Sequence, residues 1–204
     1  MKKLAYTVVL LIFLIPHNAF SENESIDILT SWPPNKVTLE VTIINYANLD
    51  KDSISIIKNV IESDSHYSKN GSIYFEGWAG ALASLGLGKT QKFEISESTV
   101  PHGDIIIDLL KDEKSSYGGY TVPYYTKNHI SAATIDIYNS NNLSSSELES
   151  VVRHEFGHSL GLGHSTKKNS AMYEFVFGNN YIEECDLAGL GALYHHYTYT
   201  KVNC

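Results

Sequence analysis

The sequence predicts one α+β (mixed α/β) domain, and three observations favour this fold class. The 204 residues are enough for a single domain with its own hydrophobic core. The apolar share of 43% and the charged share of 19% are ordinary for a globular protein. Strand patterns and amphipathic helix patterns also follow one another along the chain, so helices and strands are expected to pack together.

Five stretches have the pattern of β-strands: residues 36–45, 91–96, 103–110, 118–125 and 130–138. Residues 36–45 alternate between apolar and polar side chains and are rich in β-branched residues. Residues 103–110 are apolar enough to lie in the centre of a sheet. The fourth contains Pro123, which has no N–H group to donate to a strand ladder. This strand is therefore expected at an edge of the sheet.

Helical spacing first occurs in residues 50–68, where the isoleucines recur on one face and Asn70-Gly71 marks a turn after them. Residues 72–88 leave two alternatives open. Their large apolar residues suit a helix, whereas the first five residues alone suit a short strand.

Two further helices are predicted in the second half of the chain. In residues 144–163, Ser144 and Glu147 have the spacing of a capping box. The buried stripe of this helix consists of Leu148, Val152, Phe156 and Leu160. Residues 185–197 form a final amphipathic helix.

The N-terminus has the pattern of a secretory signal. Two lysines precede the apolar run 4–15, which is too short to cross a bilayer comfortably. Ala19 and Ser21 supply the small residues of a cleavage site before Glu22. We therefore expect a signal peptide at residues 1–21, a secreted or extracytoplasmic protein, and no membrane span after cleavage. The alternative is an uncleaved anchor that keeps the protein at the cell surface.

The charge pattern excludes nucleic acid as a partner. The chain carries 15 basic and 23 acidic residues, for a formal charge of −8, and Arg153 is its only arginine. Binding to phosphates depends on clustered Arg and Lys side chains, which this chain lacks.

The two cysteines, Cys185 and Cys204, are expected to form one disulfide in an exported protein. It would join the C-terminal tail to the start of the last helix. The alternative is two free thiols in a reducing compartment, which the signal sequence argues against. Neither cysteine has the spacing of a metal-binding pair.

A pattern of histidines marks the candidate site: His154, Glu155, His158, Gly161 and His164. On a helix, His154 and His158 project from the same face one turn apart, as two nitrogen ligands of one zinc ion do. Glu155 would lie beside the metal without ligating it, placed to take a proton from water there. Gly161 can end the helix and turn the chain, so that His164 becomes the third ligand and the fourth position stays open for water. Any one of these histidines alone would be a surface or packed imidazole, but the joint pattern favours a catalytic zinc site.

This motif resembles that of the metzincin metalloproteases, whose second element is a methionine-containing turn below the zinc. The stretch "HSTKKNSAMYEF" supplies Met172 eight residues after His164. The serine directly after His164, this short spacing and the stretch "CDLAGLGALY" of the last helix are similar to the matrixin branch. The order of the predicted elements also fits, so the resemblance covers about residues 36–195.

The resemblance implies a zincin fold: a twisted mixed sheet of about five strands, an active-site helix and a C-terminal helix. It implies one catalytic zinc ion with three ligands: His154, His158 and His164. Glu155 would be the general base and acid, Met172 would form the floor of the site, and Asp186 would hold the methionine turn by hydrogen bonds. From the residues alone, Asp186 is explained equally well as a helix-capping carboxylate. Residues 118–125 would be the edge strand that receives an extended peptide.

The chain also departs from matrixins. No cysteine precedes the first predicted strand, so a cysteine switch is not expected. Glu174 replaces the proline that matrixins have after Met-Tyr. Matrixins bind calcium through an acidic cluster near the fifth strand; only Asp136 remains of it here, so calcium has weak support. A second zinc site is not recognisable, and His129 and Asp136 are interpreted as structural. The other histidines are expected in solvent: His17, His66, His102, His195 and His196.

These patterns predict a signal peptide at residues 1–21, a short segment at 22–35 and a catalytic domain at 36–204. An upper subdomain would span 36–163 and a lower one 164–204. The predicted function is that of an exported, monomeric zinc endopeptidase acting on protein or peptide substrates. The alternative is a catalytically idle zincin domain that acts as a cell-surface binding module. Such a domain usually loses the glutamate or a ligand, and none is lost here.

Overall fold

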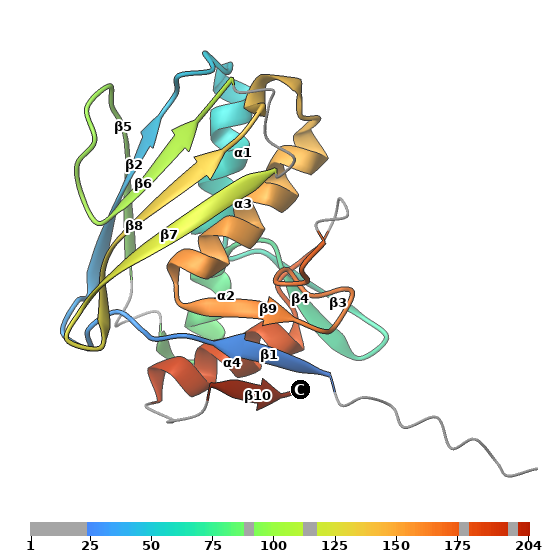
Figure 1. The fold of residues 1–204 in the computed structure, drawn as a ribbon. Helices are drawn as coiled ribbons and strands as arrows, with labels where there is room; N and C mark the ends of the chain where they lie inside the picture. Colours follow the sequence, from blue (N-terminus) through green and yellow to red (C-terminus); the bar gives the residue numbers. More distant parts are fainter. Residues whose placement is uncertain (1–23, 88–91, 112–117, 176–179, 196–199) are drawn as a thin grey trace, which may run out of the picture.

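The computed structural model describes residues 24–87, 92–111, 118–175, 180–195 and 200–204 (Figure 1). The predicted signal peptide, His17 and His196 lie outside these residues. Across the described ranges, no helix has both the length and the apolar character needed to span a membrane.

A five-stranded mixed sheet forms the larger part of the fold (Figure 1). Its order is β5-β2-β6-β8-β7, with β2 (Thr38–Ile44), β5 (Lys92–Glu97), β6 (Ile105–Leu109), β7 (Gly119–Thr126) and β8 (His129–Ile137). The first four strands in this order are parallel, and β7 pairs antiparallel with β8 at the edge. The predicted five strands are confirmed, and so is the edge position of the strand that contains Pro123.

Two helices cover one face of this sheet: α1 (Lys51–Glu62) and α3 (Ser145–Ser159) (Figure 1). The predicted capping box is present, because the Ser144 side chain accepts from the Glu147 N–H and the Glu147 carboxylate accepts from the Ser144 N–H. Alternate residues of β6 and of the second half of β8 are buried, as expected of strands packed under helices, whereas β2 is buried without interruption from Val41 to Ile44. A short 3₁₀ turn, η2 (Ser140–Asn142), leads from β8 into α3.

The stretch between α1 and β5 contains a hairpin and a short helix: β3 (His66–Lys69), β4 (Ser72–Phe75) and α2 (Trp78–Ser84). The ambiguous stretch 72–88 therefore contains both predicted alternatives, the strand first and then the helix. The predicted helix 50–68 is too long, because α1 ends at Glu62 and the following residues pair with β4 instead. Tyr67 stacks on Tyr74 across this hairpin, with ring centroids 5.1 Å apart.

A second, three-stranded sheet lies below α3 and was not predicted from the sequence. It consists of β1 (Ser25–Ile28), β9 (Leu162–Ser165) and β10 (Lys201–Asn203), all antiparallel, with α4 (Glu184–Tyr194) packed against it (Figure 1). The sequence predicts residues 22–35 as a separate segment, yet β1 is the central strand of this sheet. Trp32 is 2% exposed, and its indole N–H donates to the Ser159 carbonyl at 2.9 Å. Residues 25–32 thus pack as part of the folded unit.

Cys185 and Cys204 form a disulfide in the structure, across 19 residues of sequence. Cys185 lies in the first turn of α4 and is fully buried, whereas Cys204 follows β10 and is exposed. The bond therefore attaches the last strand to the last helix.

Cys204→Ala should lower the stability of the protein without disturbing its core, because only the exposed partner is changed. In the chain-entropy model a loop of this size contributes about 3 kcal/mol, so the free energy of unfolding should fall by about that amount. Denaturant titration measures it. Added reductant should lower the stability of the unmodified protein equally and leave the variant unchanged. A variant as stable as the unmodified protein would contradict the expectation.

Candidate active site

The three histidines of the motif lie together in the structure. His154 and His158 project from α3, and His164 comes from β9. One ring nitrogen of each lies within 4.8 Å of the others, and no other group of three His, Cys, Asp or Glu side chains among the described residues is placed to hold a metal ion. The rings of His154 and His158 lie with their centroids 4.7 Å apart. The spacing that helix geometry predicts is thus present.

Hydrogen bonds set the orientation of two of these imidazoles. Nδ1 of His154 lies 2.8 Å from the carbonyl oxygen of Ala171, and Nδ1 of His158 lies 2.8 Å from that of Leu162. A carbonyl only accepts, so each Nδ1 carries the proton and each Nε2 keeps its lone pair. The two Nε2 atoms lie 3.1 Å apart. Two lone pairs at this distance repel unless a cation lies between them. Two nitrogens bound tetrahedrally to one zinc are about 3.3 Å apart, given bonds of about 2.0–2.1 Å.

Burial also favours the form of these histidines that binds a metal. Loss of solvation lowers the pKa of His154 to about 4 and the pKa of His158 to about 3. Both imidazoles are therefore neutral at pH 7, and no proton has to leave before a metal binds. The donor set fits zinc.

Glu155 lies next to the histidines and beneath the edge strand. Its side chain is 7% exposed, and the hydroxyl of Thr121 in β7 donates to its Oε2 at 2.7 Å. Burial raises the pKa of Glu155 to about 7, and the Thr121 hydrogen bond opposes that rise. A Cβ at Gly119 would come within 2.5 Å of the Glu155 Cγ. The glycine at the start of β7 therefore leaves the room that the glutamate occupies.

A tight turn at Met172 supports the histidines from below. Met172 is fully buried, and its sulfur lies so close to Gly157 of α3 that any side chain there would collide with it. The Ser165 N–H donates to the Met172 carbonyl at 2.7 Å, which ties this turn to β9. The Ala171 carbonyl from the same turn accepts from His154. The turn thus packs under α3 and also holds one of the histidines.

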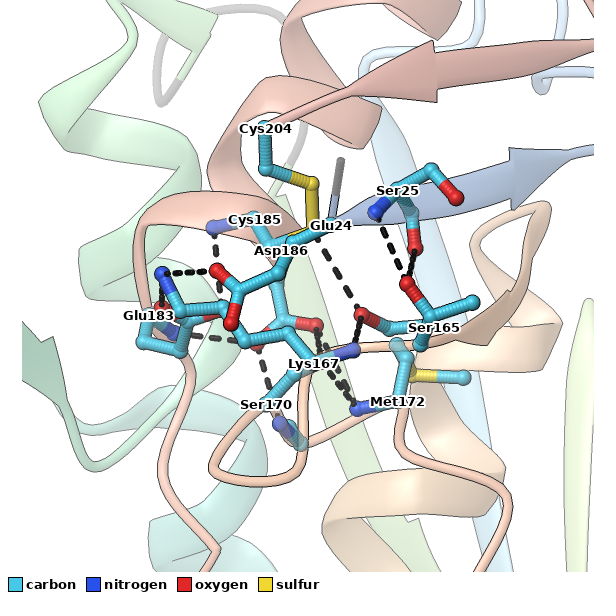
Figure 2. A network of polar contacts seen from close by, with 12 residues as sticks. Glu24, Ser25, Ser165, Lys167, Ser170, Met172, Glu183, Cys185, Asp186 and Cys204 are labelled. Atoms are coloured by element: carbon cyan, nitrogen blue, oxygen red, sulfur yellow. Dashed lines mark hydrogen bonds and ion pairs between the residues drawn. A yellow bond between two sulfur atoms is a disulfide. The ribbon is translucent and has the colours of Figure 1, made fainter. Parts of the chain in front are cut away.

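Asp186 connects this turn to α4, and Figure 2 shows the network around it. Its carboxylate accepts hydrogen bonds from the Ser170 hydroxyl at 2.5 Å and from the N–H groups of Ala171, Met172 and Glu183 at 3.0, 3.3 and 3.0 Å. The last of these bonds belongs to the capping box at the start of α4. Asp186 therefore both holds the methionine turn and caps the start of α4, the two roles that the sequence left open. Burial raises the pKa of Asp186 to about 7, and the donors around it oppose that rise.

Arg153, directly before His154, was not recognised as a structural residue from the sequence. It is 1% exposed; its Nε donates to the Glu76 carbonyl at 3.0 Å and another guanidinium nitrogen donates to the Asn180 carbonyl at 2.8 Å. Its guanidinium lies 5.1 Å from the centre of the Tyr181 ring. One side chain thus joins α3 to the hairpin region and to the chain that follows the methionine turn. In the sequence, only its position next to His154 could have indicated that Arg153 has a structural role.

The remaining candidates are not among the residues that hold the histidines, although the charge of Asp136, after burial, also raises the pKa of Glu155. His129 lies near the Ser31 carbonyl, with its Nδ1 at 3.3 Å, and Asp136 accepts from the Tyr138 hydroxyl at 3.3 Å. Exposed side chains include His66, His102, His195 and Glu174. A cavity of about 420 Å³ lies between Trp32 and the β7–β8 turn, and no motif residue lines it. We therefore do not assign it to the chemistry of the histidines.

The family model described as matrixin matches residues 65–195, which is more than half of the chain. The chain belongs to the matrixin family. The resemblance predicted from the motif is thereby confirmed, as is the mixed fold.

Two individual proteins are also similar to parts of this chain. The chain is 44% identical over 54 residues to a hatching enzyme of Paracentrotus lividus, a match that covers 25% of this chain and 9% of that protein. It is 15% identical to metalloproteinase-II from Bacteroides fragilis, whose crystal structure aligns with a TM-score of 0.45 over 80% of this chain and 54% of that one. The chain thus spans only part of the length of each.

Gly161→Ala should destabilise the protein, because Gly161 has φ +100° and a Cβ there would collide with the Thr30 carbonyl. The backbone conformation alone costs about 1–2 kcal/mol for a residue other than glycine, and the collision adds to it. The matched control is Gly191→Ala in α4, where a Cβ meets nothing within 4 Å. Thermal unfolding should show a lower midpoint for the first variant and an equal or higher one for the control. Equal midpoints for Gly161→Ala and the unmodified protein would refute this account of the turn.

Proposed function

We propose that this matrixin-family chain is a zinc-dependent endopeptidase that is exported from the cell. The observation that carries the proposal is the convergence of two neutral Nε2 atoms, with His164 close by, beside a buried carboxylate. His154, His158 and His164 would hold the ion. A zinc ion in such a site polarises a carbonyl and lowers the pKa of water.

Glu155 supplies the proton chemistry in this proposal. Its carboxylate accepts a proton from the water that attacks the scissile carbonyl, and it then donates that proton to the leaving amine. A pKa close to the working pH suits both steps, and burial raises the pKa of Glu155 toward that range. The free edge of β7 runs past this carboxylate, so an extended peptide added to that edge would place a backbone carbonyl near it.

Export is supported by the disulfide, because such bonds persist in oxidising compartments. We propose that residues 1–21 are removed as a signal peptide and that the folded unit acts as a monomer on protein or peptide substrates. Sequencing the N-terminus of the protein recovered outside the cell would test the cleavage site, which should give a chain that starts at Glu22.

Removing the metal should abolish cleavage of an unfolded protein substrate such as reduced casein. The expected result is loss of activity with a strong chelator and recovery on adding one equivalent of zinc, because the histidines provide the site. A serine-protease inhibitor serves as the control and should have no effect. Cleavage that survives complete removal of zinc would refute the proposed function.

Glu155→Gln should keep zinc and lose turnover. The amide cannot accept the proton, so kcat should fall by about 10²–10⁴-fold, the range attributed to general acid–base catalysis. Measuring zinc content and activity on the same sample tests separately whether zinc is kept and whether turnover is lost. Glu184→Gln, at an exposed position of α4, is the matched control and should retain full activity. Loss of zinc in proportion to activity would show that Glu155 is a ligand rather than the base.

A further inference from the structure

The backbone of β7 presents alternate residues to its free edge. Tyr138 donates its N–H to the Gly118 carbonyl at 3.0 Å, so even-numbered residues of β7 lie in the hydrogen-bonded pairs with β8. The odd-numbered residues of β8 bond in the other direction, to β6, since the Ile137 carbonyl accepts from Leu110. The N–H and C=O groups of Gly119 and Thr121 therefore point away from the sheet.

Pro123 fits this alternation. It is the next odd-numbered residue of β7, and its missing N–H falls on the free edge rather than in the ladder with β8. An added strand would therefore find a donor and an acceptor at Gly119 and at Thr121, and only an acceptor at Pro123. The part of the edge that offers both donors and acceptors, at Gly119 and Thr121, is therefore the part nearest Glu155.

The side chain of Thr121 points toward α3. Its hydroxyl lies 2.7 Å from the Glu155 Oε2 and 3.0 Å from the Glu155 backbone carbonyl. The hydroxyl has one proton to donate. The carboxylate is the stronger acceptor of the two, and the carbonyl already lies within the hydrogen-bond ladder of the helix.

We propose that the side chain of Thr121 is a positioning residue for Glu155, on the strand whose edge the proposed function already assigns to the substrate. This inference rests on the proposed function of Glu155. The hydroxyl holds Oε2 and thereby fixes the position of the other oxygen, Oε1, to which we assign the proton transfer from the attacking water. Because the same residue pairs with the substrate through its backbone, the base is kept in a constant position relative to the peptide bond that it serves.

The test compares Thr121→Val with Thr121→Ser. Valine keeps the β-branched shape and removes the hydroxyl, whereas serine keeps the hydroxyl. Loss of a hydrogen bond to a charged group lowers rates by about 10–100-fold, so kcat should fall by that factor in the valine variant. KM should change by less than about twofold, since the backbone contacts remain. The serine variant should recover kcat to within about threefold of the unmodified protein, since the hydrogen bond is retained.

Two controls separate positioning from a general structural effect. Thr126→Val changes the same side chain at the far end of β7, where the hydroxyl donates to Ser131 at 3.2 Å, and it should leave kcat unchanged. In a protein that already carries Glu155→Gln, Thr121→Val should cause little further loss, because the two residues act through one interaction. Zinc content and the thermal midpoint are measured for every variant.

The outcomes are distinct. Unchanged kcat in Thr121→Val, or failure of serine to restore kcat in a folded protein, would overturn the proposal for Thr121 while zinc-dependent cleavage remains. If the unmodified protein shows no zinc-dependent cleavage, or Glu155→Gln is fully active, the proposed function itself fails, and the role of Thr121 fails with it.

Discussion

The reversal of the chain at Gly161 is the constraint on which the candidate site depends. Its φ of +100° belongs to the left-handed region, and the Thr30 carbonyl occupies the space that a side chain would need. Since the chain turns back here, the Leu162 carbonyl can accept from His158, and β9 can pair with β1. The same reversal brings His164 to the two histidines of the helix. One glycine thus couples the end of α3, the lower sheet and the third histidine.

A second layer of contacts holds the methionine turn and, through it, the imidazole of His154. Asp186 fixes the methionine turn through the Ala171 and Met172 N–H groups, and the Ala171 carbonyl fixes the His154 imidazole. Each link is buried, where an unpaired polar group would cost about 1–3 kcal/mol. His154, and also His158 through the Leu162 carbonyl, are therefore oriented before any metal binds, so little ordering of these two side chains would remain on binding. The last helix and its disulfide, although distant in sequence, are part of this support.

The sequence was informative where residue type and spacing determine geometry. The motif predicted that His154 and His158 share a helix face, and Pro123 predicted an edge strand. The sequence was less informative where tertiary contacts determine which residues form strands and where a helix ends. The strands of the lower sheet have three or four residues each, too few for a periodic pattern, and α1 ends where the chain turns into a hairpin. The Thr121–Glu155 hydrogen bond joins residues 34 positions apart, and no local pattern indicates it.

The three histidines are proposed to form one zinc site with an open position. The decisive measurement is X-ray absorption at the zinc edge of the protein loaded with one equivalent of zinc. We expect a single tightly bound ion with three histidine nitrogens at about 2.0–2.1 Å and one further oxygen ligand. Absence of tight binding, or a sulfur neighbour at about 2.3 Å, would contradict it.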